Sequence, residues 1–174
     1  MSGQNHIIAK TPLKLLPVTE FRKRQKSIDR GSKLALMSSM MKIKADVIEK
    51  KTKAKWMKER GNDAFQEKKY QEAEKWYSKG IELNKNSRPL WTNRAICRNR
   101  MKKYKEAISD CDSALSINPK CTKSITQKGS ALLGFGRFDD AKAIFESLRT
   151  LGENTLADTY LKKLNDTKER DDFL

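Results

Sequence analysis

The sequence predicts an all-α protein, a solenoid of three helix-turn-helix repeats followed by one capping helix. The first observation is a 34-residue period, at which small residues and aromatic residues recur as Gly61, Ala95 and Gly129, as Ala73, Ala107 and Ala141, and as Tyr70, Tyr104 and Phe138. The second is that apolar residues within each unit follow a helical period and do not alternate as in a strand. Small residues allow antiparallel helices to approach closely, and a single hairpin cannot bury its own apolar face. We therefore expect the hairpins to stack.

The chain before the repeats, residues 1–46, is polar and basic and is interrupted by Pro12 and Pro17. Its apolar content is too low to offset the entropy of folding, so we expect a largely disordered basic tail. The alternative is a weak amphipathic docking helix around a cluster of apolar residues, Leu34, Leu36, Met37, Met40 and Met41. Residues 47–170 form the predicted repeat domain.

The three repeats are predicted at about 54–87, 88–121 and 122–153. Ser87, with Pro89 just after it, is typical of a helix start. Asn118 precedes Pro119 and therefore avoids the helical region, which ends the second helix of that repeat. Taken together, the patterns predict helices near 55–68, 71–84, 89–101, 105–118, 122–134 and 139–150.

The capping helix is predicted at about 155–170, because apolar residues recur there at helical spacing as Leu156, Tyr160, Leu161 and Leu164. Such a helix covers the apolar face that the last repeat would otherwise expose. Two-layered packing of the repeats should bury five large side chains, Trp91, Leu115, Leu132, Phe138 and Phe145.

The middle repeat carries a recognisable set of residues. It reads Trp91-x2-Arg94-Ala95, then Ala107-x3-Cys111, then Pro119. With the 34-residue period, this pattern resembles the tetratricopeptide repeat, or TPR. The resemblance implies antiparallel helix pairs that stack into a right-handed superhelix, with the first helix of each repeat lining a concave groove.

Composition narrows the function classes. The 174-residue chain has a net charge of +16 at pH 7, which favours an acidic partner. Three cysteines without metal-ligand spacing, Cys97, Cys111 and Cys121, are expected to be small buried residues, and His6 has no nearby partner. We found no catalytic motif, no metal site, no cofactor motif and no apolar run long enough to cross a membrane.

Five polar residues are expected on the groove side of the first helices. Repeat one offers Lys58 and Asn62, repeat two offers Asn93, and repeat three offers Lys123 and Gln127. Residues four apart lie on one helix face, so each such pair points in one direction. Two ammonium groups with interleaved amides match a carboxylate-rich peptide, because they supply both charge and directed hydrogen bonds.

The runs that hold these residues, Met57–Asn62, Trp91–Arg94 and Lys123–Lys128, resemble the carboxylate-clamp motifs of co-chaperone TPR domains. That family uses Lys and Asn, then Asn, then Lys and Arg, to bind the acidic C-terminal tails of Hsp70 and Hsp90. Four positions agree here, and Gln127 stands where the arginine is expected. The resemblance implies a cytoplasmic adaptor, expected to be a monomer and not an enzyme.

Three further interpretations stay open. Residues 54–170 also resemble the TPR section of axonemal dynein-arm assembly factors, through Asn93-Arg94-Ala95 and Cys121-Thr122-Lys123. The groove could instead serve a generic scaffold that binds another client protein. A nucleic-acid binder is the alternative from another class, supported by the basic charge and by lysines around Tyr104, namely Lys102, Lys103 and Lys105.

Overall fold

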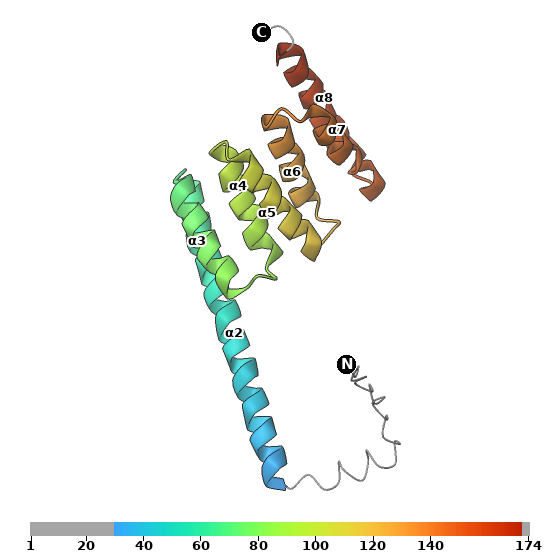
Figure 1. Ribbon diagram of the computed structural model, residues 1–174. Coiled ribbons are helices and arrows are strands. Elements are labelled where there is room, and N and C mark those ends of the chain that lie inside the picture. The colour runs from blue at the N-terminus through green and yellow to red at the C-terminus, as the bar shows by residue number, and fades with distance from the viewer. Residues whose placement is uncertain (1–29, 172–174) are drawn as a thin grey trace, which may run out of the picture. The chain divides into compact units, whose positions relative to one another are not determined.

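The computed structural model of the protein describes residues 30–171, and these form α-helices α2 to α8 and one 3₁₀-helix, with no strand among them (Figure 1). The predicted all-α class is therefore confirmed for this part of the chain. The protein divides into two units, Met1–Ala45 and Asp46–Leu174, and the second contains the repeats. Within the described residues, no helix combines the length and the apolar character that crossing a membrane requires.

The first helix, α2, runs from Arg30 to Gln66 and is longer than the sequence analysis expected. Residues 30–46 are helical, although a largely disordered segment was predicted there. The physical reason is local: neither proline nor glycine occurs between Ser32 and Arg60, and strong helix formers fill the interval. Their apolar side chains remain exposed, with Leu34 67% accessible. Residues 1–29 lie outside the described part of the chain.

The remaining helices follow the predicted hairpin order. Each packs against the next in the chain, from α3 through α4, α5, α6 and α7 to α8. The end of α2 packs on α3 through a shared apolar cluster that includes Ala64 and Tyr77. The bounds are Tyr70–Leu83 for α3, Arg88–Arg100 for α4, Tyr104–Ile117 for α5, Thr122–Gly134 for α6, Phe138–Glu146 for α7 and Asn154–Asp171 for α8.

The third repeat departs from the regular pattern at its end. Its second helix was predicted to reach residue 150, but α7 ends at Glu146 and a 3₁₀-helix follows at Arg149–Leu151. The hydroxyl of Ser147 donates to the carbonyl of Ile144, and that of Thr150 donates to the carbonyl of Ser147. Such local bonds compete with regular helical bonding, which accounts for the early end of α7.

The 34-residue period extends to the backbone of the turns inside the repeats. Lys68, Lys102 and Gly136 occupy equivalent positions and have φ values of 61°, 59° and 80°. In each turn the next residue donates its N–H to the carbonyl five residues earlier, at 2.8–2.9 Å. This is the Schellman end of a helix, which favours glycine because a side chain is strained at positive φ. Two of the three turns therefore hold a lysine in a conformation that suits glycine.

The core consists of two apolar clusters, one centred on Tyr77 and the other on Phe145. Leu132 and Phe145 are buried as predicted, and so is Cys111. Trp91, Leu115 and Phe138 are only partly buried, at the margins of the clusters. Trp91 keeps an accessible edge because its indole N–H donates to the carbonyl of Lys85 at 2.8 Å.

A buried carboxylate that the sequence analysis did not single out joins the hairpins of the first two repeats. Asp110 is 2% exposed and accepts two hydrogen bonds from Arg94, at 2.7 and 2.9 Å. Arg98 also pairs with it, at 2.8 Å, and in turn pairs with Glu74 on α3 at 2.7 Å. Because unpaired buried charges are costly, this network fixes how α3, α4 and α5 lie against one another.

The turn geometry gives a first prediction. Gly136→Ala should lower the free energy of unfolding by about 1 kcal/mol, because an added Cβ meets nothing within 4 Å and the cost is purely that of the backbone. Urea unfolding measures the effect. Lys102→Gly, the reverse change at the equivalent turn, should be neutral or stabilising. Equal destabilisation by both changes would contradict the argument.

The buried network gives a second prediction. Burial acts to raise the pKa of Glu74, but the hydrogen bonds and charges of Arg98 and Lys103 outweigh it and leave that pKa below its usual value of 4.5. The stabilisation is therefore present above about pH 4.5 and is lost as the pH falls through the folded-state pKa. Thermal unfolding between pH 5 and pH 3 should be less pH-dependent in Glu74→Gln than in the wild type. Glu82→Gln, an exposed change on the same helix, is the control and should leave the slope unchanged.

Candidate functional site

The five groove residues predicted from the sequence lie on the first helices of the three repeats. Lys58 and Asn62 belong to the last turns of α2, Asn93 to α4, and Lys123 and Gln127 to α6. All except the exposed Lys123 are partly buried. These helices are far apart in sequence, so hydrogen bonds between their side chains decide which of the five residues form one site.

A chain of hydrogen bonds joins three of the five residues across α2, α4 and α6. The amide nitrogen of Asn93 donates to Oδ1 of Asn62 at 3.1 Å. The ammonium group of Lys123 donates to Oδ1 of Asn93 at 3.4 Å. The structure thus brings Asn62, Asn93 and Lys123 together into a continuous polar row.

Tyr77 on α3 supports this row from behind. Its hydroxyl donates to Oδ1 of Asn62 at 2.8 Å, while its ring is 1% exposed. Burial raises the pKa of the Tyr77 phenol well above its usual value, so the hydroxyl remains protonated and able to donate. The sequence analysis did not single out Tyr77. The available signal was that Cys111 and Phe145, at the equivalent positions, carry no hydroxyl.

These bonds determine the polarity that the row presents. An amide oxygen has two lone pairs, and in Asn62 both are occupied, one by Tyr77 and one by Asn93. The polar group left on Asn62 is its NH₂, a donor. Beside it lies the Lys123 ammonium, which has three donors and no acceptor. The row therefore offers hydrogen-bond donors and positive charge, which is the chemistry that receives an anion.

A cavity of about 240 Å³ lies over this row. It is lined by Asn62, Phe65, Gln66, Tyr77, Asn93, Ile96 and Lys123. The apolar parts of Phe65 and Ile96 give it a hydrophobic wall beside the donors. Lys58 is not among the lining residues and lies one helical turn before Asn62 on α2.

Gln127 is held apart from this row. The amide nitrogen of Asn99 donates to the backbone carbonyl of Gln127 at 3.0 Å and lies 3.3 Å from its Oε1. Gln127 instead lines a neighbouring cavity of about 430 Å³ between α4, α6 and α8. The two cavities share Ile96, so they are consecutive parts of one groove.

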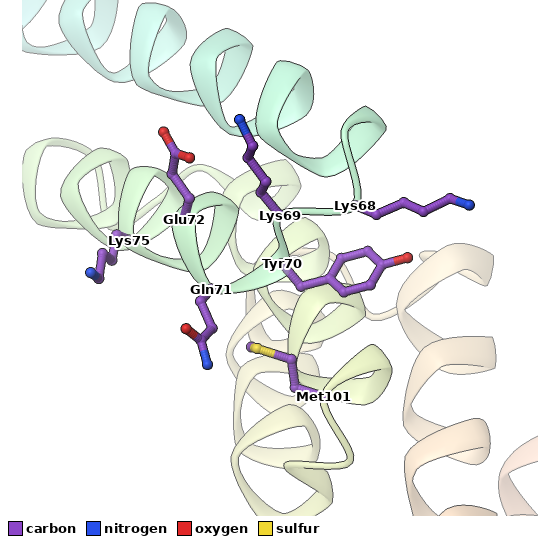
Figure 2. A pocket seen from close by; sticks show the side chains of 7 residues that line it. All are labelled: Lys68, Lys69, Tyr70, Gln71, Glu72, Lys75 and Met101. Atoms are coloured by element: carbon purple, nitrogen blue, oxygen red, sulfur yellow. The ribbon is translucent and has the colours of Figure 1, made fainter.

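Another hollow lies outside the groove. It measures about 620 Å³ and surrounds the turn between α2 and α3, where Figure 2 shows Lys68 pointing away from the start of α3. It is lined by charges of both signs, including Glu72, and by Met101. None of the five predicted residues lines it. Because its charges are mixed and solvated, we place the candidate site in the groove.

Comparisons with known proteins agree with this architecture. A sequence profile described as "Tetratricopeptide repeat" matches residues 89–121, the middle repeat. RNA polymerase II-associated protein 3 of Mus musculus is 35% identical over 114 residues, which is 65% of this chain and 17% of that protein. The chain thus spans about a sixth (17%) of the length of that curated relative.

Two solved structures are also similar. One is described as "First TPR of Spaghetti (RPAP3) bound to HSP90 peptide SRMEEVD", with 33% identity, a TM-score of 0.64, and coverage of 68% of this chain and 95% of that one. The other is the second TPR domain of human RPAP3 in complex with the HSP70 peptide SGPTIEEVD. It has 31% identity, a TM-score of 0.62, and coverage of 68% and 98%.

The packing behind the site gives a third prediction. A Cβ added at Gly61 would lie 2.5 Å from Cε1 of Tyr77, too close for any real contact. Gly61→Ala should therefore destabilise the protein by about 1–3 kcal/mol, although alanine is the better helix former by up to about 1 kcal/mol. Urea unfolding measures the sign. Glu59→Ala, an exposed change one half-turn away, should be close to neutral, and a stabilising Gly61→Ala would rule out the close approach.

Proposed function

The chain belongs to the tetratricopeptide repeat family, and we propose that it is an adaptor that binds the acidic C-terminal tails of Hsp70- and Hsp90-type chaperones in the groove of α2, α4 and α6. The observation that carries the proposal is that the row formed by Asn62, Asn93 and Lys123 presents the NH₂ of Asn62 and the ammonium group of Lys123 as donors. An anion is the ligand that such a row can satisfy. A free C-terminal carboxylate supplies one at the end of a flexible peptide.

In the proposed complex, the terminal carboxylate accepts hydrogen bonds from the NH₂ of Asn62 and from the Lys123 ammonium. Lys58 adds a second positive charge from the preceding turn of α2. The apolar wall of Phe65 and Ile96 receives the aliphatic side chain next to the terminus. Tyr77 does not touch the peptide in this arrangement. It positions Asn62, because its hydroxyl holds the amide oxygen inward and the NH₂ outward.

The similar structures support this choice of ligand. The first TPR domain of Spaghetti and the second of human RPAP3 are described as bound to HSP90 and HSP70 peptides that both end in EEVD. Such a tail carries several carboxylates within four residues, which suits a chain with a net charge of +16. The chain spans only 17% of the length of its relative RPAP3. We therefore do not infer the partners of the whole RPAP3 protein for this chain.

The described contacts weaken the nucleic-acid alternative. The ring of Tyr104 packs over Gly134, where an added Cβ would lie 2.5 Å from it, so it is no free stacking platform. Lys103 pairs with Glu74 at 3.0 Å, and Lys105 lies over the ring of Phe135 at 5.4 Å. Of the three lysines around Tyr104, namely Lys102, Lys103 and Lys105, two are therefore engaged in contacts within the protein. A cytoplasmic, monomeric adaptor without catalytic activity remains our inference, and a role in dynein-arm assembly remains a prediction.

The proposal is tested with a fluorescent peptide, Ser-Arg-Met-Glu-Glu-Val-Asp, in free and C-terminally amidated form, by fluorescence anisotropy at physiological salt. Amidation removes the recognised charge and should weaken binding at least tenfold. Lys123→Ala and Asn62→Ala should each weaken binding of the free peptide by about tenfold or more, since a hydrogen bond to a charged group contributes about 1.5–3 kcal/mol.

The control is the double change Lys120→Ala and Lys142→Ala, which removes two exposed charges outside the groove. It should reduce affinity less than Lys123→Ala does, because it lowers the overall charge without touching the site. If amidation and the groove changes leave affinity intact while the double control abolishes it, the protein binds polyanions non-specifically. If no peptide form binds although the protein is folded, the generic scaffold is the better interpretation.

A further inference from the structure

The second cavity of the groove has a charge pattern of its own. Its volume is about 430 Å³, and its lining comes from α4, the start of α5, α6 and α8. Two of the lining residues are cations, Arg100 on α4 and Lys163 on α8, and none is a carboxylate. The remaining polar lining consists of amides and hydroxyls, including those of Ser130, Tyr160 and Thr167.

The two cations in this cavity have no internal counter-ion. Two other arginines of α4, Arg94 and Arg98, are neutralised by Asp110 and Glu74. In contrast, neither Arg100 nor Lys163 forms an ion pair or a side-chain hydrogen bond with any described residue of the chain. Both side chains are exposed, so they are free to meet a ligand. The cavity therefore presents two positive charges that no described carboxylate of the chain neutralises.

Helix geometry sets the distance between this cavity and the Asn62–Lys123 row. Asn93 contributes to the first cavity and Arg100 to the second, and they lie seven residues apart on α4. Seven residues of α-helix rise about 10.5 Å, and an extended peptide covers about 3.3 Å per residue. A peptide whose terminal carboxylate lies at the row therefore reaches the second cavity about three residues before its end.

We propose that Arg100 and Lys163 form a second subsite that binds the carboxylate side chains two to three residues before the C-terminus of the peptide. This inference rests on the proposed function and goes beyond the five predicted residues, none of which except Gln127 lines this cavity. The neutral Gln127 leaves the groove short of a cation. Arg100 and Lys163 supply that charge from α4 and from the capping helix, so ligand selection extends to α8.

The experiment compares the free peptide ending Glu-Glu-Val-Asp with one ending Gln-Gln-Val-Asp, which keeps length, shape and terminal carboxylate. Wild-type protein should bind the glutamate peptide about five- to tenfold more tightly, the range expected from two exposed charge contacts. In the double variant Arg100→Gln with Lys163→Gln this preference should fall below about twofold. Retention of the full preference in that variant overturns the subsite.

The matched control is Lys142→Gln with Lys162→Gln, which removes the same charge from exposed positions outside both cavities, one of them adjacent to Lys163 on α8. This control variant should keep the preference for the glutamate peptide. If the control variant also loses that preference, the effect comes from net charge and the proposal is overturned. Failure of the proposed function has a different signature, because amidation would then have no effect on wild-type binding. Circular dichroism of both double variants verifies the helical fold.

Discussion

The groove depends on the contact between Gly61 on α2 and the ring of Tyr77 on α3. Without a side chain at Gly61 the ring lies directly against the helix backbone, and the hydroxyl then reaches Asn62 at 2.8 Å. The contact is therefore both a packing constraint and the origin of the site polarity. The same close contact recurs two repeats later, where Gly129 faces the ring of Phe145. There it contributes to packing alone, because phenylalanine has no hydroxyl.

A second constraint orders α4, the helix that contributes to both cavities. Two sides of α4 have different contacts. Asn93 and Arg100 line the groove, while Arg94 and Arg98 pair with the buried Asp110. A buried carboxylate with two guanidinium partners tolerates little displacement, since a lost partner leaves an uncompensated charge. The rotation of α4 about its axis is thereby fixed, and with it the direction of its groove residues.

The repeats are equivalent in backbone but not in chemistry. All three internal turns use the same left-handed residue and the same hydrogen bond, whichever residue type stands there. The side chains along the groove differ in kind. The first cavity holds amides and an ammonium group, and the second holds the cations Arg100 and Lys163. A regular scaffold with a varied inner surface allows an extended peptide to be read residue by residue.

The sequence by itself determined the helical class, the 34-residue period and the helices within it, because apolar spacing and small residues are properties of local chain order. It also placed Asn62, Asn93 and Lys123 on the first helices. Only the tertiary structure decided that these three share one hydrogen-bonded row, that Tyr77 orients it, and that Gln127 turns to Asn99 instead. It also revealed Asp110 as a buried charge. The physical reason is that hydrogen-bond partners 15 to 31 residues apart are set by how the helices pack, which no periodicity within one helix encodes.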